Sequence, residues 1–238
     1  MEAVRAAPEP KKDGYHHGDL RNALLVTALR LVSERGPEGF SLREAAREVG
    51  VSPGAAYRHF TDRAALLAAL AADGHVRLAE AMERALSHVP GAPGSRARTV
   101  ASLLALGGAY VEFAVAHAPH FQVMFGPCQD AEASPCSAVT GRDAFGILVD
   151  ALDGLVRAGA VTPEARAGAE ITVWSAVHGL ATLQVDGALA FAPAERAAAV
   201  RNVARLLLAG MGCPRELLPA APAIDVDPRP PAHKERGK

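Results

Sequence analysis

Apolar residues recur at helical spacing along most of the chain. Leu20, Leu24 and Leu31 fall on one face of a predicted first helix, with Asp19 as its N-cap and Gly36 at its end. Further helices are predicted over about 41–50, 52–60, 62–89, 96–117, 119–125, 137–158, 163–189 and 193–211. No stretch alternates with the period of two that a β-strand requires. The pattern therefore predicts an all-α fold of about nine helices.

Breaks in this pattern divide the chain. Residues 1–14 and 213–238 are rich in Pro and charge and lack periodicity, so we interpret them as disordered arms. The short helices up to residue 62 form a small N-terminal domain, 15–62. The helices that follow form a larger bundle, 63–212, interrupted by the turn-forming stretch "PGAPGS" at 90–95.

Composition narrows the class of protein without naming a chemistry. Half of the residues are apolar, enough for a substantial core, and the net charge is −1. No segment is strongly basic, so charge alone does not indicate nucleic acid. We find no secretory signal and no apolar run long enough to span a membrane, which predicts a cytoplasmic protein. Three cysteines without C-x-x-C spacing fit a reducing compartment, and no metal or cofactor is predicted.

Residues 41–60 carry the most specific pattern. "SLRE", from Ser41 to Glu44, is a capping box that starts one short helix, and Gly50 provides the positive φ that ends it. After only "GVS", Ser52 caps a second short helix with Pro53 at its first position. Two short helices joined this tightly predict a helix-turn-helix. Their inner seam is predicted to contain Val49, Val51, Ala56 and Phe60.

The outer face of this motif suits a DNA groove. Small residues at the leading end of the second helix permit close approach to base edges, and side-chain donors at its far end suit phosphates. The predicted DNA-binding residues are Ser41, Arg43, Ser52, Pro53, Gly54, Ala55, Tyr57, Arg58, His59 and Arg63. We assign sequence preference partly to Arg43, Arg58 and DNA shape as a hypothesis. An ordinary αα-hairpin with no DNA role is the alternative.

The stretch "FSLREAAREVGVSPGAAYRHFTDRAALLAAL", residues 40–70, resembles the DNA-binding domain of the TetR (tetracycline-repressor-like) family of bacterial transcription regulators. The resemblance extends over about residues 15–85. Ala45 and Ala56 depart from it, because the family usually carries a larger aliphatic residue there. The resemblance implies a three-helix DNA-binding domain followed by a helical bundle that dimerises and binds an inducer.

Two shorter stretches of the bundle resemble one TetR subgroup. They are "WSAVHG" at 174–179 and "HAPHFQVMFGP" at 117–127. The predicted ligand-binding residues are Phe113, Phe121, Met124, Phe125 and Trp174, with His178 as the polar group. The alternative is that all six are core residues. Small residues on the last two helices suit a four-helix dimer interface, although a monomeric bundle could bury the same helices internally.

The predicted function is a ligand-responsive repressor that binds a roughly palindromic DNA operator as a homodimer, with an unknown small-molecule effector. A first alternative is a helical small-molecule-binding or enzymatic bundle whose helix-turn-helix is structural. A second is a redox- or metal-responsive regulator that uses Cys128 and Cys136, with His117 and His120 nearby. Because the chain lacks a Gly-rich phosphate loop, H-E-x-x-H and G-x-S-x-G, no enzymatic activity is predicted.

Overall fold

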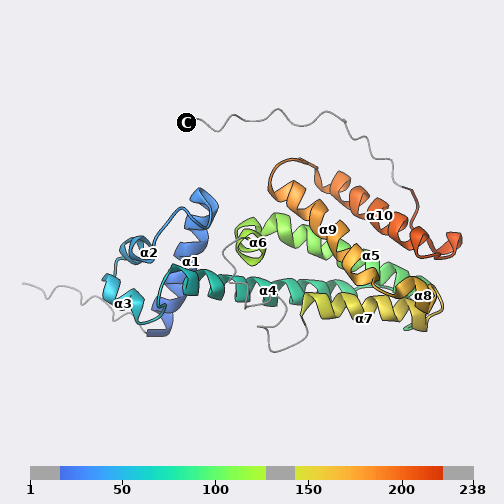
Figure 1. The fold of residues 1–238 in the computed structure, drawn as a ribbon, viewed down its shortest axis with the longest axis horizontal. Coiled ribbons are helices and arrows are strands. Elements are labelled where there is room, and N and C mark those ends of the chain that lie inside the picture. Colours follow the sequence, from blue (N-terminus) through green and yellow to red (C-terminus); the bar gives the residue numbers. More distant parts are fainter. Residues whose placement is uncertain (1–16, 127–142, 222–238) are drawn as a thin grey trace, which may run out of the picture. The chain divides into compact units, whose positions relative to one another are not determined.

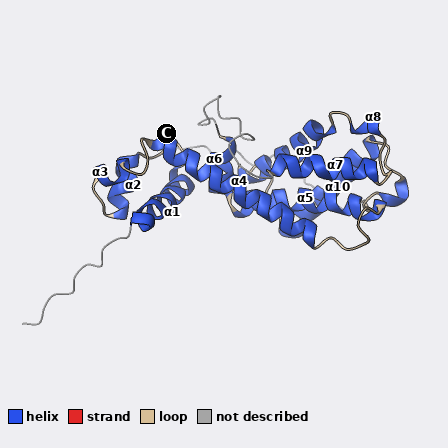
Figure 2. Ribbon diagram, turned by 90° about the horizontal axis from the view of Figure 1, so that it is seen from below, coloured by secondary structure: helices blue, strands red, loops and turns tan. Residues whose placement is uncertain are grey.

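The computed structural model describes residues 17–126 and 143–221, and the regular structure in these two ranges is entirely helical (Figures 1 and 2). The predicted all-α class is confirmed. The described helices are α1 His17–Arg35, α2 Leu42–Val49, α3 Pro53–Tyr57, α4 Arg63–Ser87, α5 Arg96–Ala116, α6 Ala118–Phe125, α7 Ala144–Arg157, α8 Pro163–Arg166, α9 Ala169–Val185 and α10 Pro193–Gly210, followed by the 3-10 turn η1 Arg215–Leu217. The predicted N-terminal arm lies outside the described residues, as does the predicted start of a helix at 137.

Three helix boundaries differ from the sequence prediction. The single helix predicted over 163–189 is wrong: it is divided into α8 and α9, because Gly168 adopts φ 72° and breaks the helical path. The first helix begins at His17, so Asp19 lies inside it and not at its N-cap. Helix α3 ends at Tyr57, three residues before the predicted end.

The chain divides into two compact units, residues 1–67 and 68–238, with the boundary inside α4. The core of the first unit packs α1 against α2 and α3. Leu24, Leu31, Ala45 and Ala56 are fully buried in it. Ala45 and Ala56, where the sequence departs from the family pattern, are therefore small residues in a tight core. An ion pair of 2.6 Å between Arg35 and Glu44 also joins the end of α1 to α2.

Helix α5 is central in the second unit, where it packs against α6, α7, α9 and α10. By length and composition alone it could cross a membrane. Its apolar residues are explained by these four neighbours, which bury Leu103, Leu106 and Tyr110. At the edge of this packing, Arg196 of α10 donates to both carboxylate oxygens of Glu112 on α5, at 2.7 and 3.1 Å. A core of α5, α7 and α9 residues thus forms around one apolar helix.

Helices α4 and α6 approach each other closely at Gly74. A Cβ placed at this glycine would lie 2.5 Å from Sδ and 2.9 Å from Cγ of Met124, which is fully buried. Both distances are shorter than van der Waals contact. Gly74 therefore provides the space that Met124 fills.

We predict that Gly74→Ala destabilises the protein and that Gly108→Ala does not. The new methyl group of Gly74→Ala overpacks Met124, at a cost of about 1–3 kcal/mol. A Cβ placed at Gly108, in the middle of α5, would have nothing within 4 Å, so alanine should stabilise the helix there by about 0.5–1 kcal/mol. Urea unfolding of the two variants measures this difference. Equal midpoints would show that Met124 moves aside without cost.

Candidate functional site

Two side-chain caps fix the helix-turn-helix in the first unit. Ser41 Oγ accepts a hydrogen bond from the backbone N–H of Glu44 at 3.2 Å, and Ser52 Oγ accepts one from that of Ala55 at 3.3 Å. Between them, Gly50 ends α2 at φ 83° and its N–H reaches back to the helix. The predicted caps and turn are confirmed at these positions. Helix α3 is therefore held at a defined angle by bonds that its own sequence supplies.

A wide surface groove runs beside the two caps. Its volume is ≈ 710 Å³, and it is lined by Ser41, Arg43, Glu44, Arg47, Gly50, Val51 and Pro53. The groove thus brings Ser41, Arg43 and Pro53 of the predicted DNA-binding set to one surface. Ser52 and Gly54 beside it are exposed, and Ala55 is half-buried. Nothing lies within 4 Å of the Cβ position of Gly54, so the leading end of α3 is open.

Some arginines of the first unit pair with glutamates of the same unit, and others form no ion pair with the described residues. Arg30 pairs with Glu34 and Glu48, and Arg35 with Glu44. The hydrogen bond from Arg35 is the main reason that the pKa of Glu44 lies below its usual value. Among the described residues, Arg43 and Arg58 form no ion pair, and both are exposed. They are therefore free to meet an external anion.

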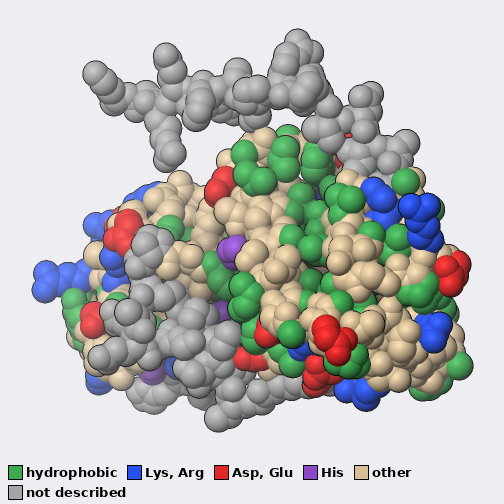
Figure 3. Space-filling model, turned by 45° about the vertical axis from the view of Figure 1, so that its right-hand side comes forward, with side chains coloured by type: hydrophobic (Ala, Val, Ile, Leu, Met, Phe, Trp, Pro, Cys, Tyr) green, Lys and Arg blue, Asp and Glu red, His purple; other side chains and the backbone are tan. Residues whose placement is uncertain are grey.

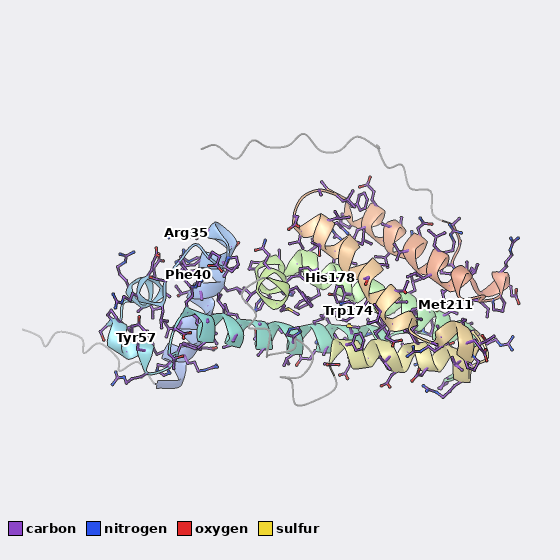
Figure 4. The ribbon with its side chains drawn as sticks, in the orientation of Figure 1. Arg35, Phe40, Tyr57, Trp174, His178 and Met211 are labelled. Carbon is purple, nitrogen blue, oxygen red and sulfur yellow. The ribbon has the colours of Figure 1, made fainter. Side chains whose placement is uncertain are left out.

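Arg63, a predicted phosphate donor, bonds to Glu38 in this structure. Its guanidinium donates to the backbone oxygen of Glu38 at 3.0 Å and pairs with the carboxylate of Glu38 at 2.7 Å. These bonds join the start of α4 to the loop after α1. Tyr57, in contrast, leaves 43% of its surface exposed at the end of α3 (Figure 4), and His59 is half-buried.

A cluster of aromatic rings lies in the second unit around Tyr110 of α5. The ring centroid of Tyr110 lies 5.2 Å from that of Trp174 and 6.0 Å from that of Phe121, and both pairs meet edge to face. Phe125 is 4.7 Å from His178 and 5.0 Å from Phe121. Trp174 and His178 are one turn apart on α9 (Figure 4), as the sequence predicts. We call these five rings the aromatic cluster. Its members are Tyr110, Phe121, Phe125, Trp174 and His178.

One hydrogen bond satisfies two polar groups of the aromatic cluster. Tyr110 Oη lies 2.8 Å from Nδ1 of His178. Burial raises the pKa of the Tyr110 phenol and lowers the pKa of the His178 imidazole, because it disfavours the charged form of each. Both side chains are therefore neutral at pH 7. The simplest arrangement has the phenol donating to an unprotonated Nδ1.

Two predicted ligand-binding residues, Phe113 and Met124, contact groups outside the aromatic cluster. Phe113 stacks on His117, with centroids 4.9 Å apart. Met124 is packed against Gly74, as described above. Beside Tyr110 and Trp174 is an apolar cavity of ≈ 30 Å³, and a second of ≈ 20 Å³ lies towards α10. Leu103, Gly107, Val173 and Val177 border both cavities.

Sequence reasoning missed Tyr110 and His75. Tyr110 follows Leu103 and Leu106 and precedes Phe113 at helical spacing, so the apolar stripe of α5 was the available signal. His75 lies three residues before Leu78, which is fully buried on α4. Its ring meets that of Phe125 edge to face, 5.6 Å away.

The metal and redox alternatives find little support in the part of the chain that the structure describes. No group of three or more His, Cys, Asp or Glu side chains in residues 17–126 and 143–221 could hold a metal ion. His120 instead bonds to Asp73 at 3.1 Å. Cys213 is buried, and burial raises the pKa of its thiol, which disfavours the reactive thiolate. Cys128 and Cys136 lie outside the described residues.

Apolar side chains are exposed on α9 and α10. Ile171 is 62% exposed, Leu206 56% and Leu183 46%. A hollow of ≈ 320 Å³ lies between these helices and α8, with Leu206, Thr172, Gly168 and Gly210 among its lining residues. Hydrophobic side chains gather on the face that Figure 3 presents. Exposed apolar residues beside a hollow on paired helices are typical of a protein–protein contact surface.

Two family models match the chain. The one described as bacterial regulatory proteins, tetR family, matches residues 24–70, and the one described as tetracyclin repressor-like, C-terminal domain, matches residues 103–207. The first match contains the helix-turn-helix, and the second contains the aromatic cluster. No curated protein matches the chain.

Solved structures share the fold over most of the chain. A protein of unknown function from Rhodococcus sp. RHA1 is 34% identical, with a TM-score of 0.67, over 84% of this chain and 99% of that one. A tetR family regulatory protein from Rhodococcus RHA1 is 20% identical, with a TM-score of 0.58, over 82% and 97% of the two chains. The TetR family regulator PfmR from Thermus thermophilus is 20% identical, with a TM-score of 0.57, over 79% and 98%.

We predict that Gly50→Ala destabilises the first unit and that Gly54→Ala does not. An alanine at position 50 would have to adopt the left-handed conformation, at a cost of about 1–2 kcal/mol. Gly54 has no such conformation and has open space around it, so alanine there should gain up to about 1 kcal/mol of helix propensity. Thermal unfolding followed by circular dichroism compares the two. A stable Gly50→Ala variant would show that the turn re-forms without a glycine.

Proposed function

Because the chain belongs to the TetR family of bacterial transcription regulators, we propose that it binds a DNA operator as a homodimer and releases it when a small molecule occupies the second unit. Such a regulator acts in the cytoplasm and needs no enzymatic activity. The observation that carries the proposal is the free, exposed pair Arg43 and Arg58 on a unit whose other arginines are largely engaged with carboxylates.

The proposed DNA contact uses the groove and the end of α3. The open leading end at Gly54 allows the backbone to approach base edges, while Tyr57 and Arg58 reach phosphates. Arg43 borders the groove and supplies a second cation. Ser41 Oγ and Ser52 Oγ accept the capping bonds, which orients the helices, and each hydroxyl keeps its hydrogen to donate to a phosphate. Arg63 acts through Glu38, as a positioning residue and not as a phosphate donor.

The homodimer supplies the second DNA-binding unit. We propose that α9 and α10 pack against the same helices of a second copy, which would cover Ile171, Leu183 and Leu206. A two-fold axis between the copies would present two α3 helices to successive major grooves. This arrangement favours a palindromic operator.

Ligand response is proposed for the aromatic cluster. The effector would bind a form of the protein in which the two DNA-binding units do not match the operator, and so shift the population away from DNA. We propose that the DNA-bound form blocks transcription, so that the protein is a repressor and the effector relieves repression. The apolar rings and neutral polar groups of the cluster are suited to a small organic ligand.

We predict that Arg58→Ala weakens DNA binding about 10- to 100-fold and reduces its dependence on salt, because one phosphate contact is lost. A labelled duplex from upstream of the protein's own gene, followed by fluorescence anisotropy at several salt concentrations, measures this. Combining the change with Tyr57→Ala should abolish binding while leaving ligand binding unaltered.

Arg30→Ala is the matched control for this experiment. Arg30 is also an exposed arginine of the first unit, but it is paired with Glu34 and Glu48. Its removal should change DNA affinity much less. If both arginine variants bind the duplex as the unaltered protein does, α3 is not the DNA-contacting element.

We also predict that Leu206→Glu dissociates the dimer. A charged side chain in the proposed interface would be buried without a partner, which association cannot offset. Sedimentation at several protein concentrations measures the change. Val26→Glu is the control. Val26 is also an exposed apolar residue, with 67% of its surface accessible, but it belongs to α1 of the first unit and not to α9 or α10. A monomeric Val26→Glu protein or a dimeric Leu206→Glu protein would contradict the assigned interface.

A further inference from the structure

The second unit holds one buried polar atom beside the aromatic cluster that lacks a partner. Nε2 of His75 is buried and makes no hydrogen bond to any of the described residues. The neighbouring polar groups are satisfied: Tyr110 bonds to His178, and His120 bonds to Asp73. A buried polar atom without a hydrogen bond costs folding free energy. A ligand group that bonds to this nitrogen would recover that cost and so bind more tightly.

The charge around His75 restricts the kind of ligand. Burial lowers the pKa of the imidazole, so the ring is neutral at pH 7. The charge that acts on it comes from the carboxylate of Asp143, which caps α7 through a bond of 2.6 Å from the N–H of Gly146. Among the described residues, this carboxylate is the charge that acts on the ring, and it would repel a carboxylate or phosphate ligand. An ammonium group would be attracted by this carboxylate, but it would lose its hydration among apolar rings, and burying an unpaired charge costs more than burying a neutral group.

The ring that faces His75 favours a flat ligand. Phe125 presents its ring at 80° to that of His75, and Phe125 itself lies against the rings of Phe121, Trp174 and His178. Aromatic rings bind further rings edge to face or offset, as they do here with one another. An aromatic ligand could therefore replace contacts of the same kind.

We propose that the effector is an uncharged aromatic molecule with a hydroxyl group, and that Nε2 of His75 bonds to that hydroxyl. The assignment rests on the proposed function, because it gives the ligand class of the same regulatory site. A hydroxyl both donates and accepts, so it serves the imidazole in either tautomer. The ring of the effector then lies against Phe125.

The space in this conformation is too small for such a ligand. The cavity beside Tyr110 and Trp174 has ≈ 30 Å³ and is not lined by His75, whereas a dry cavity that holds benzene has about 150 Å³. Binding must therefore move rings of the aromatic cluster. Trp174 is the single tryptophan of the chain, so its fluorescence reports that movement directly.

Four small probes of similar size test the ligand class with the full-length protein. They are phenol, toluene, benzoate and benzylamine, each titrated at pH 7 while Trp174 fluorescence is followed. We expect phenol to bind about tenfold tighter than toluene, because it alone gains the hydrogen bond. Benzoate and the benzylammonium ion should bind more weakly than phenol. An ion that binds more tightly than phenol, or phenol no tighter than toluene, would overturn the proposal.

Variants of His75 locate the bond. His75→Phe keeps a ring but removes the nitrogen, so phenol should lose its roughly tenfold advantage while toluene binds as before. His75→Gln keeps a polar group and should retain part of the advantage. Equal losses for phenol and toluene would mean that His75 shapes the site without bonding to the ligand. The ranking of the four probes on the unaltered protein tests the proposal even where a variant does not fold.

The DNA assay separates this inference from the proposed function. If the protein binds its duplex but shows no preference for phenol over toluene, the ligand assignment fails alone. If phenol binds with the expected ranking and saturating phenol leaves the duplex bound, the ligand assignment stands and release by ligand fails.

Discussion

A polar group that leaves water must find a hydrogen-bond partner inside the protein, and this constraint organises the second unit. Tyr110 and His178 enter an apolar core from two different helices, and each is the partner of the other. Their bond therefore fixes α5 relative to α9 more specifically than apolar packing does. The surrounding rings can then pack edge to face. The same constraint makes the nitrogen of His75 informative, because it is one of the few buried side-chain polar atoms of the described residues that lack a partner.

The first unit meets the opposite requirement, since its functional surface must stay hydrated until DNA replaces the water. Its hydroxyl groups are used locally, as caps of α2 and α3, and several of its arginines neutralise glutamates. Surface ion pairs of this kind contribute little stability. Their larger effect is to reduce the positive charge that is available to a polyanion. Arg43 and Arg58 are among the described arginines that form no ion pair, so a chain of net charge −1 still carries local positive charge on this unit.

Local signals predicted the first unit well and the second unit less well. The caps at Ser41 and Ser52 and the turn at Gly50 depend on neighbouring residues, so the sequence contains all that determines them. The engagement of Arg63 with Glu38 joins residues far apart in the sequence, and no local pattern indicates it. The same holds for His75 and Phe125, which come from different helices. Gly168 was missed because a glycine inside an apolar helical pattern is often tolerated.

Three consecutive residues of α4 each contact α6, and this arrangement links the aromatic cluster to the helix that begins in the first unit. Asp73 bonds to His120, Gly74 accommodates Met124, and the ring of His75 meets Phe125. A molecule inserted between His75 and Phe125 must separate α4 from α6 or rotate one of them. Because interiors are close-packed, the contacts of Asp73 and Gly74 cannot absorb such a change without moving as well. Helix α4 runs from Arg63 to Ser87, and Arg63 at its start pairs with Glu38 inside the first unit. The boundary between the two units lies about two turns before His75 in this helix, so a ligand at His75 would act on the helix in which the boundary lies.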